Sequence, residues 1–133
     1  PQTIFTFGKY NNKKDVLEAV DKMPYPKGST YTGRALQYMN DEIYRKATRV
    51  GVPNILIVLT DGKAHDSVAE PAKALRDIGI EIYSIGVGES YDKAELDAIA
   101  TDPDASHVFS VDFKNMNSIV STLDARICTG TKT

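Results

Sequence analysis

The chain has 133 residues, 41% of them hydrophobic and 26% charged, which is the composition of one globular domain. A chain of this length buries roughly two thirds of its unfolded surface. The formal net charge of −2 and the scattered lysines exclude the basic surface that nucleic-acid binding requires. The longest apolar run, Ile55 to Leu59, is too short to cross a bilayer, so we expect no membrane insertion. No signal peptide is visible, and if the protein is secreted we expect its leader to have been removed.

Segments with strand and helix patterns alternate along the sequence, which predicts parallel βα units. Thr3 to Phe7 alternates polar and apolar residues and is expected to form a half-exposed strand. Lys13 to Met23 places apolar residues on one helical face, and Pro24 and Pro26 end that helix. After a polar loop, Arg34 to Thr48 again has the spacing of an amphipathic helix.

The second predicted strand, Asn54 to Thr60, is a continuous aliphatic run and is typical of the centre of a sheet covered on both faces. The elements expected after it alternate between helix and strand, over residues 68–78, 80–86, 93–101, 107–111 and 116–127. Among them, Gly79 is a natural residue to end a helix, and Asp92 with Glu95 forms a predicted capping box.

This order of elements predicts a single α/β domain over residues 1–128. We expect a three-layer, doubly wound and mostly parallel sheet with helices on both faces. Residues 129–133 are polar and are expected to form a loose C-terminal tail.

Loops that follow parallel strands are where ligands bind in such a sheet, because they meet helix N-termini there. Asp61 follows the aliphatic strand, and the loop Gly86-Val87-Gly88-Glu89-Ser90 follows the next one. The loop Gly28-Ser29-Thr30-Tyr31-Thr32-Gly33 leads directly into a helix. We expect the three loops to face one crevice, with the following residues as candidates for contact with a ligand: Ser29, Tyr31, Gly88 and Glu89.

A carboxylate and threonine hydroxyls at such a crevice suit a hard cation, Mg²⁺, Mn²⁺ or Ca²⁺, rather than a soft metal. Two protein oxygens do not fill an octahedral shell, however. A structural interpretation is equally open: Asp61 caps the turn after its strand, and Thr30 caps the helix that begins near Gly33. Tyr31 either touches a ligand or packs on the helix that follows.

Two motifs resemble the von Willebrand factor type A domain family. The stretch Gly28-Ser29-Thr30-Tyr31-Thr32-Gly33-Arg34-Ala35-Leu36 is similar to the family's GGTxTGxAL, and Ile55 to Gly62 is similar to its hydrophobic strand ending in TDG. Residues 82–88 resemble the family's next strand and turn, so the resemblance covers essentially the whole chain. It implies a Rossmann-like sheet, and it places Thr30 and Asp61 in a metal-ion-dependent adhesion site.

The resemblance implies adhesion and no enzymatic activity. In this family the cation completes its shell with a carboxylate from a partner, commonly collagen or another matrix protein. We therefore expect a secreted or cell-surface module of the extracellular matrix that binds a protein through an acidic residue of that protein. A second hypothesis is a metal-independent domain of the same family that serves in structure or assembly.

One part of the family's pattern is absent from this sequence. The DxSxS motif, which supplies further metal ligands after the family's first strand, does not occur, and the chain corresponds to the family from its third strand, at Thr3 to Phe7. We expect a preceding segment of roughly fifty residues to be missing or to be supplied by another polypeptide. Without it, the strand 54–60 should expose one edge and apolar side chains, and cation binding should be weak or absent.

Cys128 is the only cysteine and cannot form a bridge within the chain. Taken alone, a buried thiol near the end of a helix is expected. The resemblance instead implies a disulfide, because many secreted members join a cysteine at this place to one before the first strand. An intermolecular bridge is a further possibility.

A hydrophobic strand ending in aspartate also occurs in nucleotide hydrolases and in phosphotransfer domains. The first class needs a GxxxxGK[ST] loop and the second an acidic pair ahead of Asp61, and the sequence has neither. His65 and His107 supply too few nitrogen ligands for a zinc site. The fragment Gly86-Val87-Gly88 is too short to be a dinucleotide-binding fingerprint. The sequence therefore predicts binding rather than catalysis.

Overall fold

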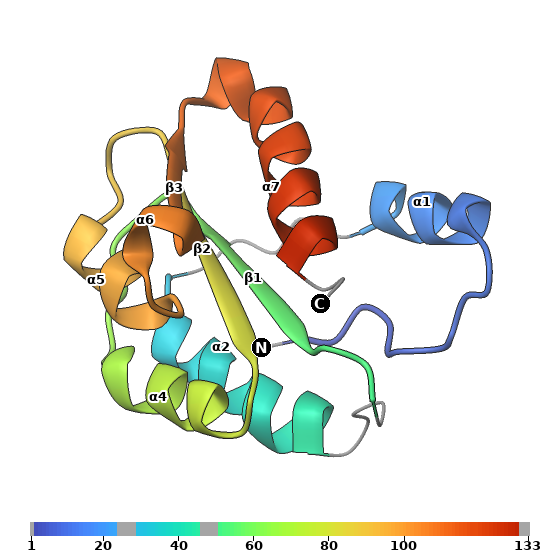
Figure 1. Cartoon of the computed structure of the whole chain (residues 1–133), viewed down its shortest axis with the longest axis horizontal. Helices are drawn as coiled ribbons and strands as arrows, with labels where there is room; N and C mark the ends of the chain where they lie inside the picture. Colours follow the sequence, from blue (N-terminus) through green and yellow to red (C-terminus); the bar gives the residue numbers. More distant parts are fainter. Residues whose placement is uncertain (1, 24–28, 46–50, 131–133) are drawn as a thin grey trace.

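A computed structural model describes residues 2–23, 29–45 and 51–130 of the chain. In these parts, three parallel strands form one sheet in the order β1-β2-β3 (Figure 1). The strands are β1 (Ile55–Thr60), β2 (Glu81–Val87) and β3 (Val108–Val111). Ile55 pairs with Glu81 at one end of β1, and Thr60 pairs with Gly86 at the other.

Helices connect the strands and cover the sheet. They are α1 (Lys13–Asp21), α2 (Thr32–Tyr38), the π-helical η1 (Met39–Tyr44), α4 (Ala69–Asp77), α5 (Lys93–Ile99), α6 (Asp104–His107), the 3₁₀ turn η2 (Phe113–Asn115) and α7 (Met116–Gly130). Figure 1 shows α2 and α4 on one side of the sheet and α7 on the other. This arrangement confirms the predicted α/β fold. Within the three described ranges, no helix is long and apolar enough to span a membrane.

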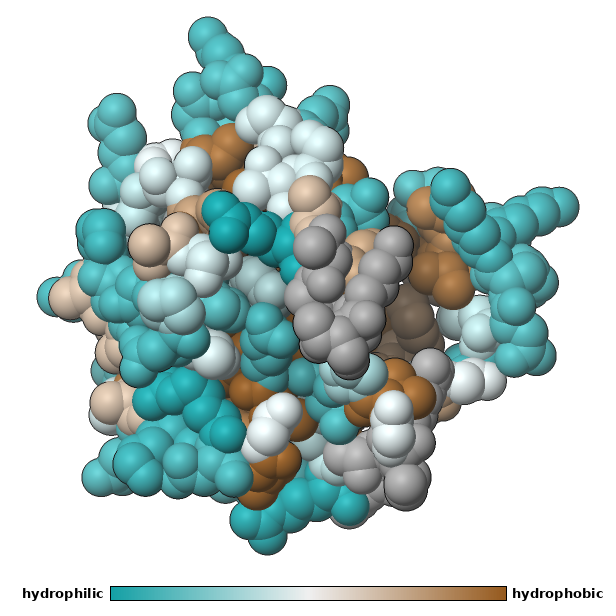
Figure 2. All heavy atoms as spheres, viewed as in Figure 1, coloured by the Kyte–Doolittle hydropathy of each residue, from teal (hydrophilic) through white to brown (hydrophobic). Residues whose placement is uncertain are grey.

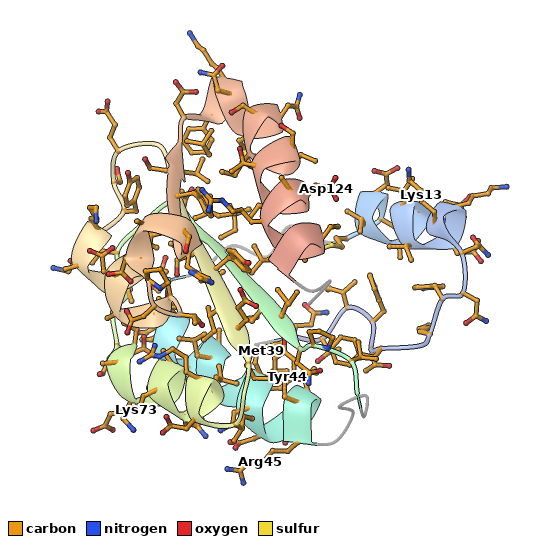
Figure 3. All side chains as sticks on the ribbon, viewed as in Figure 1. Lys13, Met39, Tyr44, Arg45, Lys73 and Asp124 are labelled. Carbon is orange, nitrogen blue, oxygen red and sulfur yellow. The ribbon has the colours of Figure 1, made fainter. Side chains whose placement is uncertain are left out.

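The main core lies between the sheet and the helices α2, α4 and α5. Leu75 and Ile82 are completely buried in it, and each contributes about 1.5–3 kcal/mol through removal of its side chain from water. The cluster consists of Leu36, Tyr44, Leu56, Val68, Ala72, Leu75, Ile80, Ile82 and Ile99. Tyr44, which is labelled in Figure 3, also links η1 to β1, because its hydroxyl donates a hydrogen bond to the carbonyl of Ile55 at 2.7 Å.

Residues Thr3 to Phe7 do not form the predicted strand. A strand needs a neighbour to accept and donate its backbone hydrogen bonds, and none of the described strands pairs with this segment. The segment contacts the body through side chains instead: the hydroxyl oxygens of Thr3 and Tyr38 are 2.6 Å apart. Alternation of polar and apolar residues was therefore not sufficient to make a strand here.

Helix α1 forms as predicted but ends at Asp21 rather than Met23. Asn12 caps it, because its side-chain oxygen accepts a hydrogen bond from the amide of Asp15 at 2.9 Å. No residue of α1 is buried, although its apolar side chains share a face. Figure 1 shows α1 standing away from the sheet, and Figure 2 shows hydrophobic surface on α1 and in the hollow beside it.

Strand β1 lies at an edge of the described sheet and not at its centre. It pairs with β2 alone, and its side chains Ile57 and Leu59 are 45% and 54% exposed. The prediction of a central strand covered on both faces is therefore wrong for the described residues. Among the described residues, the other edge of β1 has no paired strand, which agrees with the exposed edge expected from the sequence.

The remaining elements differ from the predictions mostly at their ends. Helix α2 begins at Thr32, two positions before the predicted start, and residues 46–48 of that predicted helix lie outside the described residues. His107 ends the short helix α6 instead of beginning a strand. Helix α7 continues to Gly130, so the first two residues of the predicted tail are helical, while 131–133 lie outside the described residues.

Candidate functional site

The carboxyl ends of β1 and β2 and the beginning of α2 meet at one rim of the molecule. A hollow of about 350 Å³ lies at this rim, and both Thr30 and Asp61 line it. Its other walls are mostly apolar and consist of Leu59, Thr60, Val87, Phe113 and Met116. The structure therefore brings together the two residues in which the sequence predicted a cation site.

The loops that carry these two residues are in direct contact. The amide of His65 donates a hydrogen bond to the carbonyl of Thr30 at 2.8 Å. A Cβ atom built on Gly62 would lie 3.7 Å from Oγ1 of Thr30, so the threonine hydroxyl reaches the turn that follows Asp61. Both side chains thus belong to one small region of the surface.

Asp61 does not cap the turn after β1, which was the structural interpretation left open by the sequence. Thr60 does so: its hydroxyl accepts a hydrogen bond from the amide of Gly62 at 3.3 Å and donates one to the carbonyl of Gly62 at 3.2 Å. The carboxylate of Asp61 is exposed and makes no hydrogen bond or ion pair with another described residue. It is therefore available to a ligand.

Thr30 does not cap helix α2 either. The N-cap residue is Tyr31, whose side chain makes no capping hydrogen bond. The carboxylate of Asp66 caps the helix instead, accepting hydrogen bonds from the amides of Gly33 at 2.9 Å and Arg34 at 2.8 Å. Asp66 has no local signal in the sequence, because the amides that it caps lie 33 and 32 positions away, beyond the reach of any local capping pattern.

Gly33 is required by the close approach of these two loops. A Cβ atom at this position would lie 1.9 Å from the backbone carbonyl oxygen of Ser67. A backbone atom cannot move aside as a side chain can, so only glycine fits. Together with the bonds made by Asp66 and His65, this contact fixes the loop of Thr30 against the loop of Asp61.

The loop after Asp61 is also attached to helix α5. Asp92 caps α5 by accepting hydrogen bonds from the amides of Ala94 and Glu95 at 2.9 and 3.4 Å. Glu95 does not complete the predicted capping box, because its carboxylate accepts a hydrogen bond from the amide of Ala64 at 3.0 Å. Lys63 adds an exposed ion pair with Asp92 at 3.7 Å, which contributes little.

The last residue of β2, Val87, lines the hollow, and the loop that follows it was predicted to contact a ligand. Gly88 has φ +80°, a conformation that favours glycine, and its amide donates a hydrogen bond to the carbonyl of Val111 at 2.9 Å. A Cβ atom built on Gly88 would lie 2.9 Å from Cε2 of Phe113, so the absence of a side chain leaves room for that ring. Gly88 and the exposed Glu89 follow Val87 but do not themselves line the hollow. Phe113 does line it, is 64% exposed, and was not singled out in the sequence.

Ser29 and Tyr31 lie at a neighbouring hollow of about 380 Å³, which shares Thr30 with the first. Tyr31 is 45% exposed, so it is not packed away against α2. Its ring lies 5.6 Å from the ring of His65 and 5.1 Å from the guanidinium of Arg34. Both Ser29 and Tyr31 are therefore accessible to a ligand.

Cys128 is exposed on α7, and its Sγ lies 3.2 Å from a carboxylate oxygen of Asp124. The expectation of a buried thiol is therefore wrong. With one cysteine in the sequence, no disulfide forms within this chain.

A family model described as the von Willebrand factor type A domain matches residues 1–122. The chain belongs to this family. As a von Willebrand factor type A domain it is 39% identical over 127 residues to matrilin-1 of Gallus gallus, covering 93% of this chain and 26% of that protein. It is 36% identical over 135 residues to the collagen alpha-1(XII) chain of Notophthalmus viridescens, covering 99% of this chain and 14% of that protein. The chain thus spans about a quarter or less of the length of these relatives.

A solved von Willebrand factor type A structure also resembles the chain. Proximal thread matrix protein 1 from the mussel byssus, solved with a zinc-occupied MIDAS motif, superposes with a TM-score of 0.81 and 30% sequence identity. The match covers 96% of this chain and 32% of that one. Both the family and its α/β fold are therefore shown for this chain.

The side chains at the rim of this von Willebrand factor type A domain offer the type of oxygen ligand that a hard divalent cation prefers, but too few of them to complete its coordination shell. Thr30 offers a hydroxyl oxygen and Asp61 two carboxylate oxygens, which are ligands that Mg²⁺, Mn²⁺ and Ca²⁺ prefer. In the three described ranges, no group of three or more His, Cys, Asp and Glu side chains is placed to hold a metal ion. Thr30 and Asp61 would therefore hold a cation only together with further oxygen atoms.

Proposed function

We propose that this domain is an adhesion module that binds a protein ligand through a divalent cation held by Thr30 and Asp61. The observation that carries the proposal is that both side chains line one hollow and neither is used as a cap. Thr60 caps the turn after β1 and Asp66 caps α2, which are the roles that the sequence left open for Asp61 and Thr30. The cation would supply a concentrated positive charge for a carboxylate of the ligand. Mg²⁺, Mn²⁺ and Ca²⁺ are the proposed ions, and the zinc in the mussel byssus structure supports a divalent one.

The remaining ligands of the cation, in this proposal, come from a segment that docks along the open edge of β1. The hollow of about 380 Å³ extends from Thr30 to Val58 and Leu59, beside that edge. Exposed Ile57 and Leu59 support such docking, because an aliphatic edge is stabilised when another strand covers it. The oxygen ligands of the family's DxSxS motif would then reach Thr30 and Asp61, and the 133 residues alone would bind the cation weakly.

The proposed partner is a protein of the extracellular matrix, such as a collagen, and the proposed location is outside the cell. The names of the relatives support this assignment, since they include a matrilin, a collagen chain and a thread matrix protein. We infer a role in binding and not in catalysis. The exposed carboxylate of Asp61 is suited to hold an ion, and no nucleophile and base are paired beside it in the described residues.

Paramagnetic broadening by Mn²⁺ tests the cation site and detects weak binding. In ¹⁵N-labelled protein, Mn²⁺ should broaden the amide signals around Thr30 and Asp61, and EDTA should restore them. Asp61→Asn should abolish the broadening, whereas Asp77→Asn, which neutralises an exposed carboxylate on α4, should leave it unchanged. Equal broadening in the Asp61→Asn protein, or broadening centred elsewhere, would show that the cation assignment is wrong.

A second function, metal-independent assembly, is favoured by the open edge of β1. In that case the edge itself would pair with a strand of a partner, and Thr30 and Asp61 would have no part in binding. Association with a partner that persists in EDTA and in the Asp61→Asn protein, but is lost in Ile57→Lys, would support this function over the first.

A further inference from the structure

Three side chains beside Thr30 form an exposed cationic and aromatic surface, which we call the Tyr31 platform. It consists of Tyr31, Arg34 and His65, all exposed. The guanidinium of Arg34 lies 5.1 Å from the centre of the Tyr31 ring, and the imidazole of His65 lies 5.6 Å from it on the neighbouring loop. The ring of Tyr31 is therefore in contact range of a guanidinium cation and of a second aromatic ring that bears N–H donors.

The backbone beneath the platform is fixed by hydrogen bonds between its two loops. The amide of His65 is bonded to the carbonyl of Thr30, which precedes Tyr31. Asp66, next to His65, accepts from the amide of Arg34 at 2.8 Å. Since each platform residue is adjacent to or part of such a bond, binding would require little ordering of the backbone and would cost correspondingly less entropy.

Within the described residues, the guanidinium of Arg34 packs on the ring of Tyr31 and forms no ion pair. No carboxylate of a described residue lies within ion-pair distance of its guanidinium. Arg76 shows the contrast, because its guanidinium donates to the carbonyls of Ala98 and Ile99 and so joins α4 to α5. Arg34 is exposed and its guanidinium lies over an aromatic ring, an arrangement suited to ligand recognition.

We propose that the Tyr31 platform binds an acidic segment of a partner protein, independently of any cation. A carboxylate of that segment would pair with the planar donors of Arg34, and a neighbouring apolar or aromatic side chain of the partner would pack on Tyr31. His65 would donate a further hydrogen bond to the segment. This site is distinct from Thr30 and Asp61 in the atoms it uses and in the chemistry that it offers.

A sulfated polysaccharide fits the platform less well than an acidic peptide. Polyanions are bound by rows of basic side chains, whereas the platform has one arginine and one histidine in a chain of net charge −2. The carboxylates of Asp61 and Asp66 also lie in the loop that carries His65 and would repel a dense array of sulfates. A single carboxylate flanked by neutral residues avoids this repulsion.

An NMR titration in EDTA tests the proposal on the whole chain. The probe is a blocked hexapeptide of sequence Gly-Gly-Glu-Tyr-Gly-Gly, compared with the same peptide carrying Gln for Glu. The Glu peptide should shift the signals of Tyr31, His65 and the Arg34 side chain, and the Gln peptide should not. Arg34→Glu should weaken binding at least about tenfold. Arg126→Glu, the same charge change on the exposed face of α7, should leave binding unchanged.

Equal binding of the two peptides, or unchanged binding by the Arg34→Glu protein, would overturn the proposal. So would a heparin-derived hexasaccharide that binds the platform more tightly than the Glu peptide, since the ligand class would then be a sulfated glycan. If Arg34→Glu does not fold, Tyr31→Ala serves in its place, because the Tyr31 side chain makes no capping bond, and it should weaken binding about threefold. The EDTA in the buffer separates this result from the Mn²⁺ experiment on Asp61.

Discussion

The carboxylate of Asp66, in the loop after β1, lies 2.9 Å from the backbone amide of Gly33 in the first turn of α2. This bond and its companion at Arg34 join the two loops that carry Asp61 and Thr30. The position of the candidate cation ligands therefore depends on a carboxylate that has no proposed contact with the cation. Asp66 positions these two loops, and experiments can separate this role from binding of the cation.

Asp66→Ala should destabilise the domain by about 1–3 kcal/mol, because it leaves two amides of α2 without their acceptor. Asp66→Asn should cost less, since the asparagine oxygen can still accept one of the two bonds. Urea unfolding followed by circular dichroism measures the free energy of unfolding for each variant. Asp77→Ala is the control, because that carboxylate is exposed and paired only with Lys73 on the surface. A loss in Asp66→Ala no larger than in the control would contradict the assigned role.

Gly33→Ala should be among the most damaging single-methyl additions in the chain. Its Cβ would overlap the carbonyl oxygen of Ser67 at 1.9 Å, and relief requires the backbone to move. We expect a loss of about 3 kcal/mol or failure to fold, at the upper end of the range for overpacking. Gly62→Ala is the matched control, because its Cβ would meet only Oγ1 of Thr30 at an ordinary 3.7 Å, and it should change stability by less than about 0.5 kcal/mol. Similar thermal unfolding midpoints for the two variants would show that the loops are not packed this closely.

Two buried tyrosines should make the domain sensitive to alkali. Burial raises the pKa of Tyr44 from 10.0 to about 12, and burial together with the Glu81 carboxylate raises the pKa of Tyr83 to about 12. Between these values the unfolded chain loses its phenolic protons and the folded chain keeps them, so stability falls as pH rises from about 10 to about 12. Each two-unit shift corresponds to a loss of about 3 kcal/mol.

Absorbance at 295 nm measures this titration directly. Of the seven tyrosines in the sequence, Tyr44 and Tyr83 should ionise late and together with unfolding. Replacing Tyr83 by Phe should remove part of the loss of stability above pH 10. Ionisation of all seven near pH 10 with no change in the urea midpoint would contradict the burial of these two phenols.

Local sequence patterns predicted the elements that have their partners within the chain. The aliphatic run at Ile55–Thr60 and the alternation after it were sufficient for β1, β2 and the helices around them, because those segments bury their apolar faces against one another. The same kind of pattern failed at Thr3 to Phe7, since a strand also needs a neighbour for its backbone.

The two candidate metal ligands could be predicted from motifs, but the residues that hold their loops in place could not. Thr30 and Asp61 were recognisable because they stand in short stretches similar to a family. Asp66 and Glu95 act on amides more than thirty positions away, and no periodicity or capping pattern reports contacts of that range. Three-dimensional proximity was needed to identify them.

The exposed edge of β1 should cause the isolated chain to associate, and Ile57→Lys should prevent it. The edge strand Ile55–Thr60 carries no charge, and Ile57 is 45% exposed, so copies can pair edge to edge at high concentration. A lysine at this position keeps its charge in water and disfavours such pairing, while its methylene groups retain part of the packing of Ile57. Light scattering over a range of protein concentrations should show a monomer for Ile57→Lys and larger species for the unaltered chain. Ile78→Lys is the control, since Ile78 is 49% exposed at the end of α4 and away from the edge, and it should associate as the unaltered chain does. Equal association of the Ile57→Lys protein would show that the open edge of β1 is not the surface through which the chains meet.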